Sequence, residues 1–146
     1  YVVMNIGAFA CIFLMKKEGK YMEEITDLSG ISKKNPLIAI SFLIILFSLA
    51  GIPPLGGFFA KFYVFVSVIE SGLYTLAIIG LLTTVVSAFY YLRIIKVIYF
   101  DEIKKPFDEI KNISITSTVL LSCFLLVTFF LYPSLLSNVI NSIFIN

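Results

Sequence analysis

Long runs of apolar residues with almost no charge limit most strongly what this sequence can fold into. Residues 37–69 contain one charged side chain, Lys61, and residues 73–92 contain none. Residues 1–15 and 112–146 are also uncharged. A helix needs roughly 20 apolar residues to cross a bilayer. The runs lack the alternation of a membrane β-strand, so they predict transmembrane helices rather than a barrel.

The composition excludes several classes of protein. Hydrophobic residues make up 60% and charged residues 14% of the 146 positions, whereas a soluble domain is about 45–50% apolar and about 25% charged. The 15 Phe and 8 Tyr residues argue against disorder. A net charge of +2 is too small to indicate nucleic-acid binding. The sequence has no histidine, which excludes His-ligated metals and His-based nucleophile pairs.

The two cysteines, Cys11 and Cys123, lie far apart in apolar runs and form no CxxC pair. We interpret them as small buried hydrophobic residues. A redox or metal-binding role is the alternative interpretation.

The 11 basic residues predict how the spans are oriented. Five lie in the polar segment 16–35, five lie at or beyond the end of the run 73–92, and the remaining one is Lys61. The positive-inside rule places both basic segments on the cytoplasmic side. Two crossings must then separate them, so we expect residues 37–69 to cross once, as a single interrupted span, with the C-terminus outside.

The polar connections carry signals for helix ends. Apolar residues in the segment 21–28 have helical spacing, which predicts a short interfacial helix with Gly30 as its C-cap. Asn35 and Pro36 then supply an N-cap and a proline at the first helical position. Residues 70–72 are expected to form the turn between the second and third spans.

The centre of the span 37–69 contains residues that interrupt a helix. Pro53 and Pro54 have no amide hydrogen, so a helix through them would leave the carbonyls of Leu49 and Ala50 without partners. Three glycines remove the steric bar to non-helical angles: Gly51, Gly56 and Gly57. Broken helices of this kind mark ion-binding sites in transporters, because non-helical backbone at membrane depth must be satisfied by protein or water. A simple kink is the alternative.

Lys61 follows this break and is the candidate proton-transfer residue. It lies about 13 Å along a helix from Glu70, and a lysine at bilayer depth costs at least about 2.5–3.5 kcal/mol. An ammonium so placed can exchange its proton near neutral pH, as a proton relay requires. The alternative is that Lys61 extends toward the Glu70 side to reach water. Candidates for a hydrated path are Asn5, Thr83, Thr84 and Ser87, for which helix packing is the alternative.

Two segments of the chain resemble the antiporter-like membrane subunits of proton-translocating NADH:quinone oxidoreductase, respiratory complex I. They are FSLAGIPPLGGFFAKFYVF (47–65) and SAFYYLRIIKVIYFDE (87–102). Within that family the endings AKFYVF and SAFYYLR, with MNIGAFA (4–10), are most similar to subunit N, also called subunit 2. The GIPP element alone is shared by all these subunits and by multisubunit cation/proton antiporters. The final helix resembles the family only by position and hydrophobicity.

The resemblance implies an all-α fold: a polytopic transmembrane helix bundle with one broken helix, the truncated second inverted repeat of an antiporter-like fold. Residues 1–98 would belong to the proton-antiporter-like transmembrane domain, and residues 99–146 would form a cytoplasmic loop and the final transmembrane helix. Lys61 would stand at the lysine that the family uses for proton transfer. Since the sequence begins with Tyr1 inside an apolar run, we expect an N-terminal portion to be missing.

The function implied is proton translocation by a non-redox subunit of complex I, coupled to quinone reduction elsewhere. Flavin, iron–sulfur clusters and quinone belong to other subunits, so we expect no cofactor or metal in this chain. The implied partners are other membrane subunits of complex I and the lipid bilayer, in a bacterial inner membrane or a mitochondrial one. The alternatives are a subunit of a multisubunit sodium/proton antiporter or membrane-bound hydrogenase, and a structural scaffold that conducts no ions.

Overall fold

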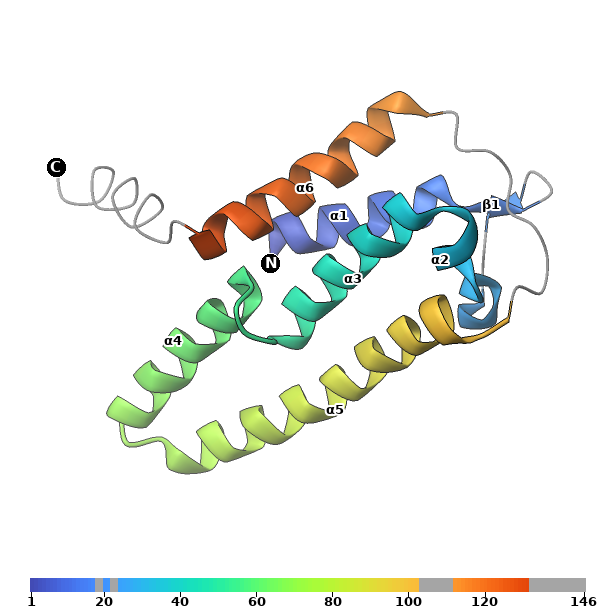
Figure 1. Cartoon of the computed structure of the whole chain (residues 1–146). Helices are drawn as coiled ribbons and strands as arrows, with labels where there is room; N and C mark the ends of the chain where they lie inside the picture. The colour runs from blue at the N-terminus through green and yellow to red at the C-terminus, as the bar shows by residue number, and fades with distance from the viewer. Residues whose placement is uncertain (18–19, 22–23, 103–111, 132–146) are drawn as a thin grey trace, which may run out of the picture.

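The computed structural model describes residues 1–17, 20–21, 24–102 and 112–131, and helices dominate it (Figure 1). The long helices are α1 (Val2–Leu14), α3 (Pro36–Ala50), α4 (Gly56–Glu70), α5 (Tyr74–Phe100) and α6 (Ile113–Leu131). Shorter elements separate α1 from α3: strands β1 (Lys16–Lys17) and β2 (Lys20–Tyr21), the 3-10 turn η1 (Ile25–Leu28) and the helix α2 (Ile31–Lys34). The described chain is therefore helical apart from one small antiparallel hairpin.

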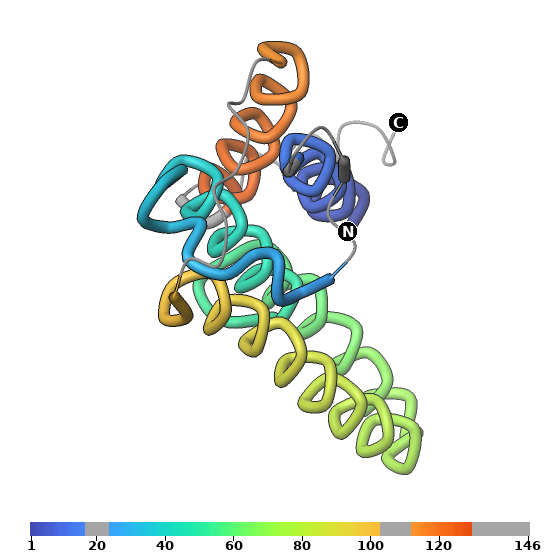
Figure 2. The backbone as a smooth tube through the Cα atoms, turned by 90° about the vertical axis from the view of Figure 1, so that its right-hand side faces the viewer, coloured from blue at the N-terminus to red at the C-terminus, as the bar shows by residue number. Residues whose placement is uncertain are grey.

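Helix α3 lies at the centre of the bundle. Helices α1 and α6 pack against one side of it, and α5 packs along another (Figures 1 and 2). The side chains of Ala39 and Ile45 are completely buried. Apolar residues surround α3 rather than forming one stripe, which suits a helix covered on several sides. Gly7 allows α1 to approach α3 and α6 closely, because a Cβ there would lie 2.9 Å from both Ile45 and Ser122.

The interrupted helix follows the length of α5. Among the described residues, α5 is the one helix both long enough and apolar enough to cross a membrane, and α1, α3 and most of α6 are shorter apolar helices. Helices α3 and α4 succeed one another, and α5 runs back past both of them (Figure 1). The residues between them include Pro53 and Pro54, which are exposed and joined by a cis peptide bond. Two half-length helices thus cover the length that α5 covers alone.

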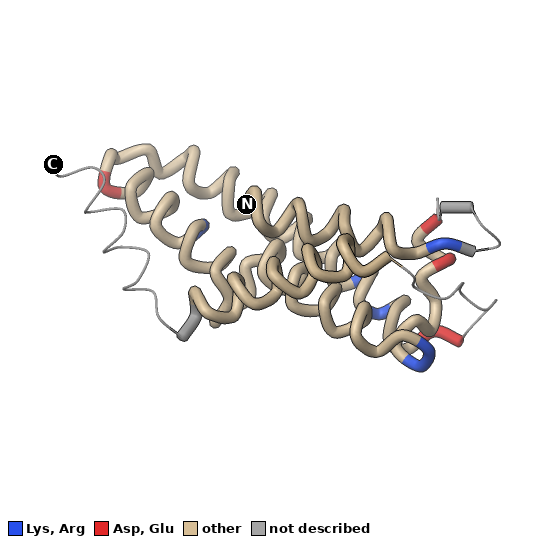
Figure 3. The backbone as a smooth tube through the Cα atoms, turned by 90° about the horizontal axis from the view of Figure 1, so that it is seen from above, with Lys and Arg blue, Asp and Glu red and all other residues tan. Residues whose placement is uncertain are grey.

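The two basic segments lie at the same end of the molecule. Figure 3 shows the described charged residues gathered mainly at one end, with long uncharged stretches of helix beyond it. The amide of Gly30 donates to the carbonyl of Val97 at 3.3 Å, which ties the segment before α3 to the last turns of α5. The chain thus returns to the same end after α3, α4 and α5, as two crossings between the basic segments require, and the crossings themselves stay a prediction.

The segment before α3 differs from the predicted interfacial helix. Pairing of Lys16 with Tyr21 places the start of this segment in a hairpin. Among the described residues of 21–30, the helical part is η1, where the amide of Glu24 donates to the carboxylate of Asp27 at 3.4 Å in a capping box. Gly30 has a positive φ of 70° but precedes α2, so it is not the C-cap of a longer helix. The prediction was wrong because the spacing of apolar residues gives no information about pairing between strands.

Two other local predictions agree with the structure. Pro36 is in the first turn of α3 and Asn35 is its N-cap residue, although the Asn35 side chain makes no capping hydrogen bond. The carbonyl of Asn35 accepts from the amide of Ala39 at 3.1 Å. Residues 71–73 connect α4 to α5, and Gly72 has a positive φ of 75°. Most of the predicted cytoplasmic loop (103–111) and the end of the chain (132–146) lie outside the described residues.

Candidate functional site

Helix α3 ends in a motif that provides hydrogen-bond donors for some of its last carbonyl groups. Gly51 adopts a left-handed conformation (φ 81°) directly after Ala50, the last residue of α3. Its amide donates to the carbonyl of Ser48, and the amide of Ile52 donates to the carbonyl of Phe47, both at 3.0 Å. This pair of bonds is a Schellman motif, which favours glycine at the left-handed position. The last two carbonyls of α3 still lack a partner within the helix.

Lys61 provides the partner for those two carbonyls, which belong to Leu49 and Ala50. Its Nζ donates to the Leu49 oxygen at 2.8 Å and to the Ala50 oxygen at 3.3 Å. The half-buried side chain lies over Gly51, where a Cβ would be 3.0 Å from the Cδ of Lys61. An ammonium here also faces the negative end of the α3 dipole. The carbonyls that the two prolines free from the helix are therefore the ones that Lys61 binds.

A second hydrogen bond crosses the break from a donor on α4 to an acceptor on α3, and here the side chain belongs to α3. The amide of Gly57 donates to the Oγ of Ser48 at 3.1 Å, and the Ser48 side chain is completely buried. Leu55 is the N-cap residue of α4 and makes no side-chain capping bond. Ser48 therefore does for α4 what a serine at the N-cap does for its own helix. The two half-helices cap each other, and we call the Ser48–Gly57 and Lys61–carbonyl contacts the reciprocal caps.

The glycines at the break differ in what they contribute. Gly51 has a positive φ, but Gly56 and Gly57 are the first two residues of α4. The expectation that all three supply non-helical angles is therefore wrong for Gly56 and Gly57. Their small size matters instead, because a Cβ at Gly57 would overlap the carbonyl oxygen of Ser48. A Cβ at Gly56 would lie 3.0 Å from the ring of Phe129 on α6.

The broken helix and its lysine lie inside a segment that matches a known family. A family model described as "NADH:quinone oxidoreductase/Mrp antiporter, TM" matches residues 1–87. The chain belongs to this family. It is 52% identical over 143 residues to NADH-quinone oxidoreductase subunit N of Pelagibacter ubique, and 49% identical over 134 residues to that of Parvibaculum lavamentivorans. These alignments take in 98% and 92% of this chain but 30% and 28% of the relatives, so the chain spans about 30% of their length.

The fold of this antiporter-family chain is also similar to a solved structure. A chain in respiratory complex I from Thermus thermophilus with bound aureothin matches it with a TM-score of 0.78 and 29% sequence identity. The match covers 92% of this chain and 31% of that one. Together with the subunit N relatives, this match confirms the resemblance to subunit N that we based on segments 4–10, 47–65 and 87–102.

Three of the residues predicted to line a hydrated path lie on α5, and their side chains form hydrogen bonds with the backbone of α5 itself. Thr83 and Thr84 donate to the carbonyl of Gly80 at 2.8 and 2.9 Å, and Ser87 donates to the carbonyl of Thr83 at 3.0 Å. Thr83 and Ser87 are exposed. Within the described residues, none of these hydrogen bonds leads to Lys61, so a hydrated path along α5 stays a prediction.

Asn5 is an exposed residue of α1. It lines an open groove of about 590 Å³ between α1 and α6 whose other walls are mainly apolar. The lining residues are Val2, Asn5, Ile6, Phe9, Ala10, Phe13, Ser114, Ile115 and Thr118. The structure therefore gathers Lys61 with Gly51 and Gly57, but it does not bring Asn5 to them.

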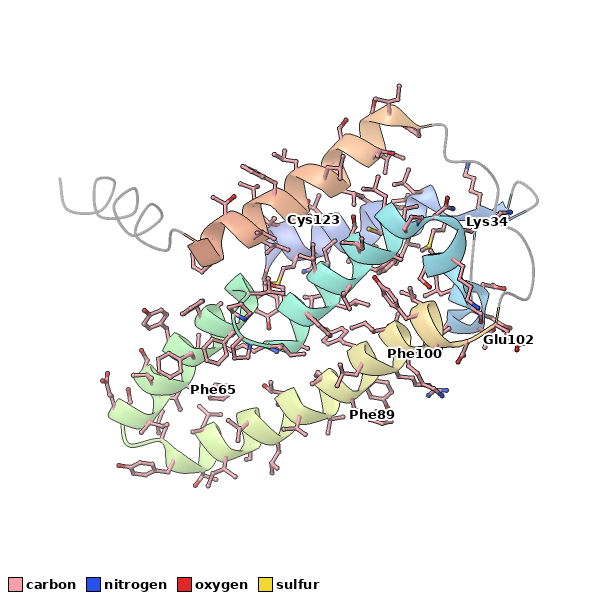
Figure 4. The ribbon with its side chains drawn as sticks, in the orientation of Figure 1. Lys34, Phe65, Phe89, Phe100, Glu102 and Cys123 are labelled. Carbon is pink, nitrogen blue, oxygen red and sulfur yellow. The ribbon has the colours of Figure 1, made fainter. Side chains whose placement is uncertain are left out.

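The cysteines lie within the helix bundle, as Figure 4 shows for Cys123. Both Cys11 and Cys123 are free and buried, which confirms their predicted packing role. The Sγ of Cys123 lies 3.8 Å from the carbonyl oxygen of Ser41. In the part of the chain that the structure describes, no three His, Cys, Asp or Glu side chains are placed to hold a metal ion.

Ser48 is the site residue that sequence reasoning missed. A serine in an apolar helix ordinarily bonds to its own backbone, as Ser41 does when it donates to the carbonyl of Leu37 at 2.8 Å. Ser48 differs because it occupies the last turn of α3 and accepts from the next half-helix. Its place just before the glycine and proline residues of the break is the signal that sequence reasoning needed.

Proposed function

We propose that this chain is part of a proton-translocating membrane subunit N of NADH:quinone oxidoreductase, and that Lys61 transfers protons in it. One observation carries the proposal: the amine of Lys61 lies at the interruption of a helix, bound by two backbone carbonyls. The family and the curated relatives support the rest of the assignment. This function makes the chain a non-redox part of a translocase whose redox centres belong to other subunits.

The chemistry of Lys61 suits proton transfer. An ammonium has three N–H donors, and Leu49 and Ala50 accept from it. Neutral carbonyl dipoles stabilise the ammonium without the full countercharge of a carboxylate, so the charged form is not fixed by an ion pair. The neutral amine also keeps N–H groups that can donate to the same carbonyls. Lys61 can thus lose and regain a proton while it stays at the break.

The arrangement of the helices supports the finer membrane assignment. Because α3 and α4 together match the length of α5, we assign them to one interrupted crossing of a polytopic bundle, in the second inverted repeat of an antiporter-like fold. Residues 1–98 then belong to the antiporter-like domain, and 99–146 to a cytoplasmic loop and a final span. The proposed surroundings are other membrane subunits of complex I and the lipid of a bacterial inner membrane. Flavin, iron–sulfur clusters and quinone would be bound by other subunits.

The substitution Lys61→Met in the complete subunit, within the assembled complex, tests the proposal. We expect the protons moved per NADH oxidised in sealed membrane vesicles to fall, because proton transfer at the step that Lys61 serves should slow by about a hundredfold or more. Coupled NADH:quinone turnover should fall as well, because electron transfer and proton movement are linked. Lys96→Met is the matched control, since Lys96 is exposed near the charged end of α5, and it should pump normally.

The scaffold alternative makes the opposite prediction. If the chain only supports its partners, Lys61→Met removes a costly charge from the membrane and is tolerated or stabilising. Pumping with the stoichiometry of the unmodified complex in Lys61→Met, at normal assembly, would therefore contradict the assignment of Lys61.

A further inference from the structure

The reciprocal caps join the same short stretch of α3 to the same face of α4. Ser48 is followed directly by Leu49 and Ala50, the residues whose carbonyls bind Lys61. On α4, Gly57 and Lys61 are one turn apart and so lie on the same face of the helix. The bond from Gly57 to Ser48 is therefore adjacent to the bonds that hold the amine.

The Ser48 contact joins a short buried side chain to backbone, whereas the Lys61 contact is made by a long, half-buried side chain. The hydroxyl of Ser48 is buried, and the backbones of the two half-helices touch at Gly57. Lys61 reaches the break through four methylene groups and is half-buried. The position of the first turn of α4 consequently determines where the lysine side chain begins and which carbonyls its amine reaches.

We propose that Ser48 is a positioning residue for proton transfer: its hydroxyl caps α4 and thereby holds Lys61 at the carbonyls of Leu49 and Ala50. The inference rests on the proposed function of Lys61 and extends it to a second side chain. Without the hydroxyl, the Gly57 amide loses its acceptor and the first turn of α4 is freer to move relative to α3. The amine then spends less time at the two carbonyls.

The experiment compares serine variants in the complete subunit of the assembled complex. Ser48→Ala should lower coupled proton pumping about fivefold, the effect of losing one N-cap hydrogen bond. It should lower kcat for quinone reduction and leave the KM for quinone unchanged. Ser41→Ala is the matched control, because Ser41 is a buried serine of the same helix whose hydroxyl donates to the Leu37 carbonyl within α3, away from the break. Ser48→Thr keeps the hydroxyl and should restore most of the pumping.

Combination with Lys61→Met separates positioning from a general effect on folding. If Ser48 acts through Lys61, Ser48→Ala should cause no further loss of pumping in the Lys61→Met background. Equal effects of Ser48→Ala and Ser41→Ala, or a further independent loss in the double variant, would overturn the inference. If Ser48→Ala lowers the amount of complex, Ser48→Cys, a weak acceptor of similar size, replaces it in the same comparison.

The outcomes also separate this inference from the proposed function. Impaired pumping in Lys61→Met with normal pumping in Ser48→Ala rejects only the role of Ser48. Normal pumping in Lys61→Met rejects the role of both residues.

Discussion

At Gly57 the backbones of α3 and α4 are so close that one added methyl group would disturb the break. A Cβ at this position would overlap the carbonyl oxygen of Ser48. This oxygen belongs to the backbone, so it cannot move away by a change of side-chain rotamer. We expect Gly57→Ala to separate α3 from α4, to destabilise the subunit by about 1–3 kcal/mol and to impair pumping. The amount of assembled complex in membranes and its pumping ratio measure both effects.

The neighbouring residue provides the control for this prediction. Gly56→Ala makes the same chemical change one position earlier, where the nearest described atoms to the added Cβ belong to the ring of Phe129. A ring can shift by a few tenths of an ångström, and alanine is a better helix former than glycine by about 1 kcal/mol. Gly56→Ala should therefore assemble and pump nearly normally. If the two variants behave alike, the close backbone contact at Gly57 is not what holds the break together.

The sequence allowed only part of this site to be predicted. Prolines remove definite hydrogen bonds, so Pro53 and Pro54 point directly to the carbonyls of Leu49 and Ala50. Lys61 stands out because charge is rare in an apolar span. The contact between Ser48 and Gly57 follows no helical period, since it crosses the interruption, and it depends on how two half-helices are placed in space. That placement is a tertiary property that a single sequence does not specify.

The connection between α4 and α5 contains a glycine with a positive φ, Gly72. Gly72 has a φ of 75°, and a Cβ there would meet no atom of the described residues within 4 Å. Gly72→Ala should therefore cost about 1–2 kcal/mol through backbone strain alone, whereas Gly72→Asn should cost less, because asparagine tolerates the left-handed region. The midpoint of thermal unfolding in detergent measures the difference, with a thiol-reactive dye reporting exposure of the buried Cys11 and Cys123.

A larger loss of stability in Gly72→Asn than in Gly72→Ala would contradict this explanation, because it would imply a steric contact at the turn.

Helix boundaries were predictable where a single residue type determines them. The proline at the start of α3 and the glycine after its end act through backbone geometry and need no partner from elsewhere. The segment 16–30 was not predictable in the same way. Its hairpin depends on pairing between Lys16 and Tyr21, and its 3-10 turn begins at a local capping box. Weak helical spacing in a short polar segment does not compete with these interactions.

At the scale of the molecule, charge decides the orientation. The exposed residues Lys34 and Glu102 lie at the same end of the bundle (Figure 4), although the interrupted helix and α5 separate them in sequence. Phe65, labelled in the same view, belongs to the opposite half, where α4 and α5 pack together. By the positive-inside rule, we expect the end that contains Lys34 and Glu102 to face the cytoplasm.

Cysteine labelling of the complete subunit in sealed vesicles tests this orientation. A membrane-impermeant maleimide should label Lys34→Cys and Glu102→Cys from the cytoplasmic side and Ser71→Cys only from the other side. The two native cysteines of this segment should stay silent, because Cys11 is 0% and Cys123 is 8% exposed. Labelling of Lys34→Cys and Glu102→Cys from opposite sides would mean that α3 and α4 cross the membrane separately. The break would then lie outside the bilayer, where water satisfies the carbonyls of α3 and no buried lysine is needed.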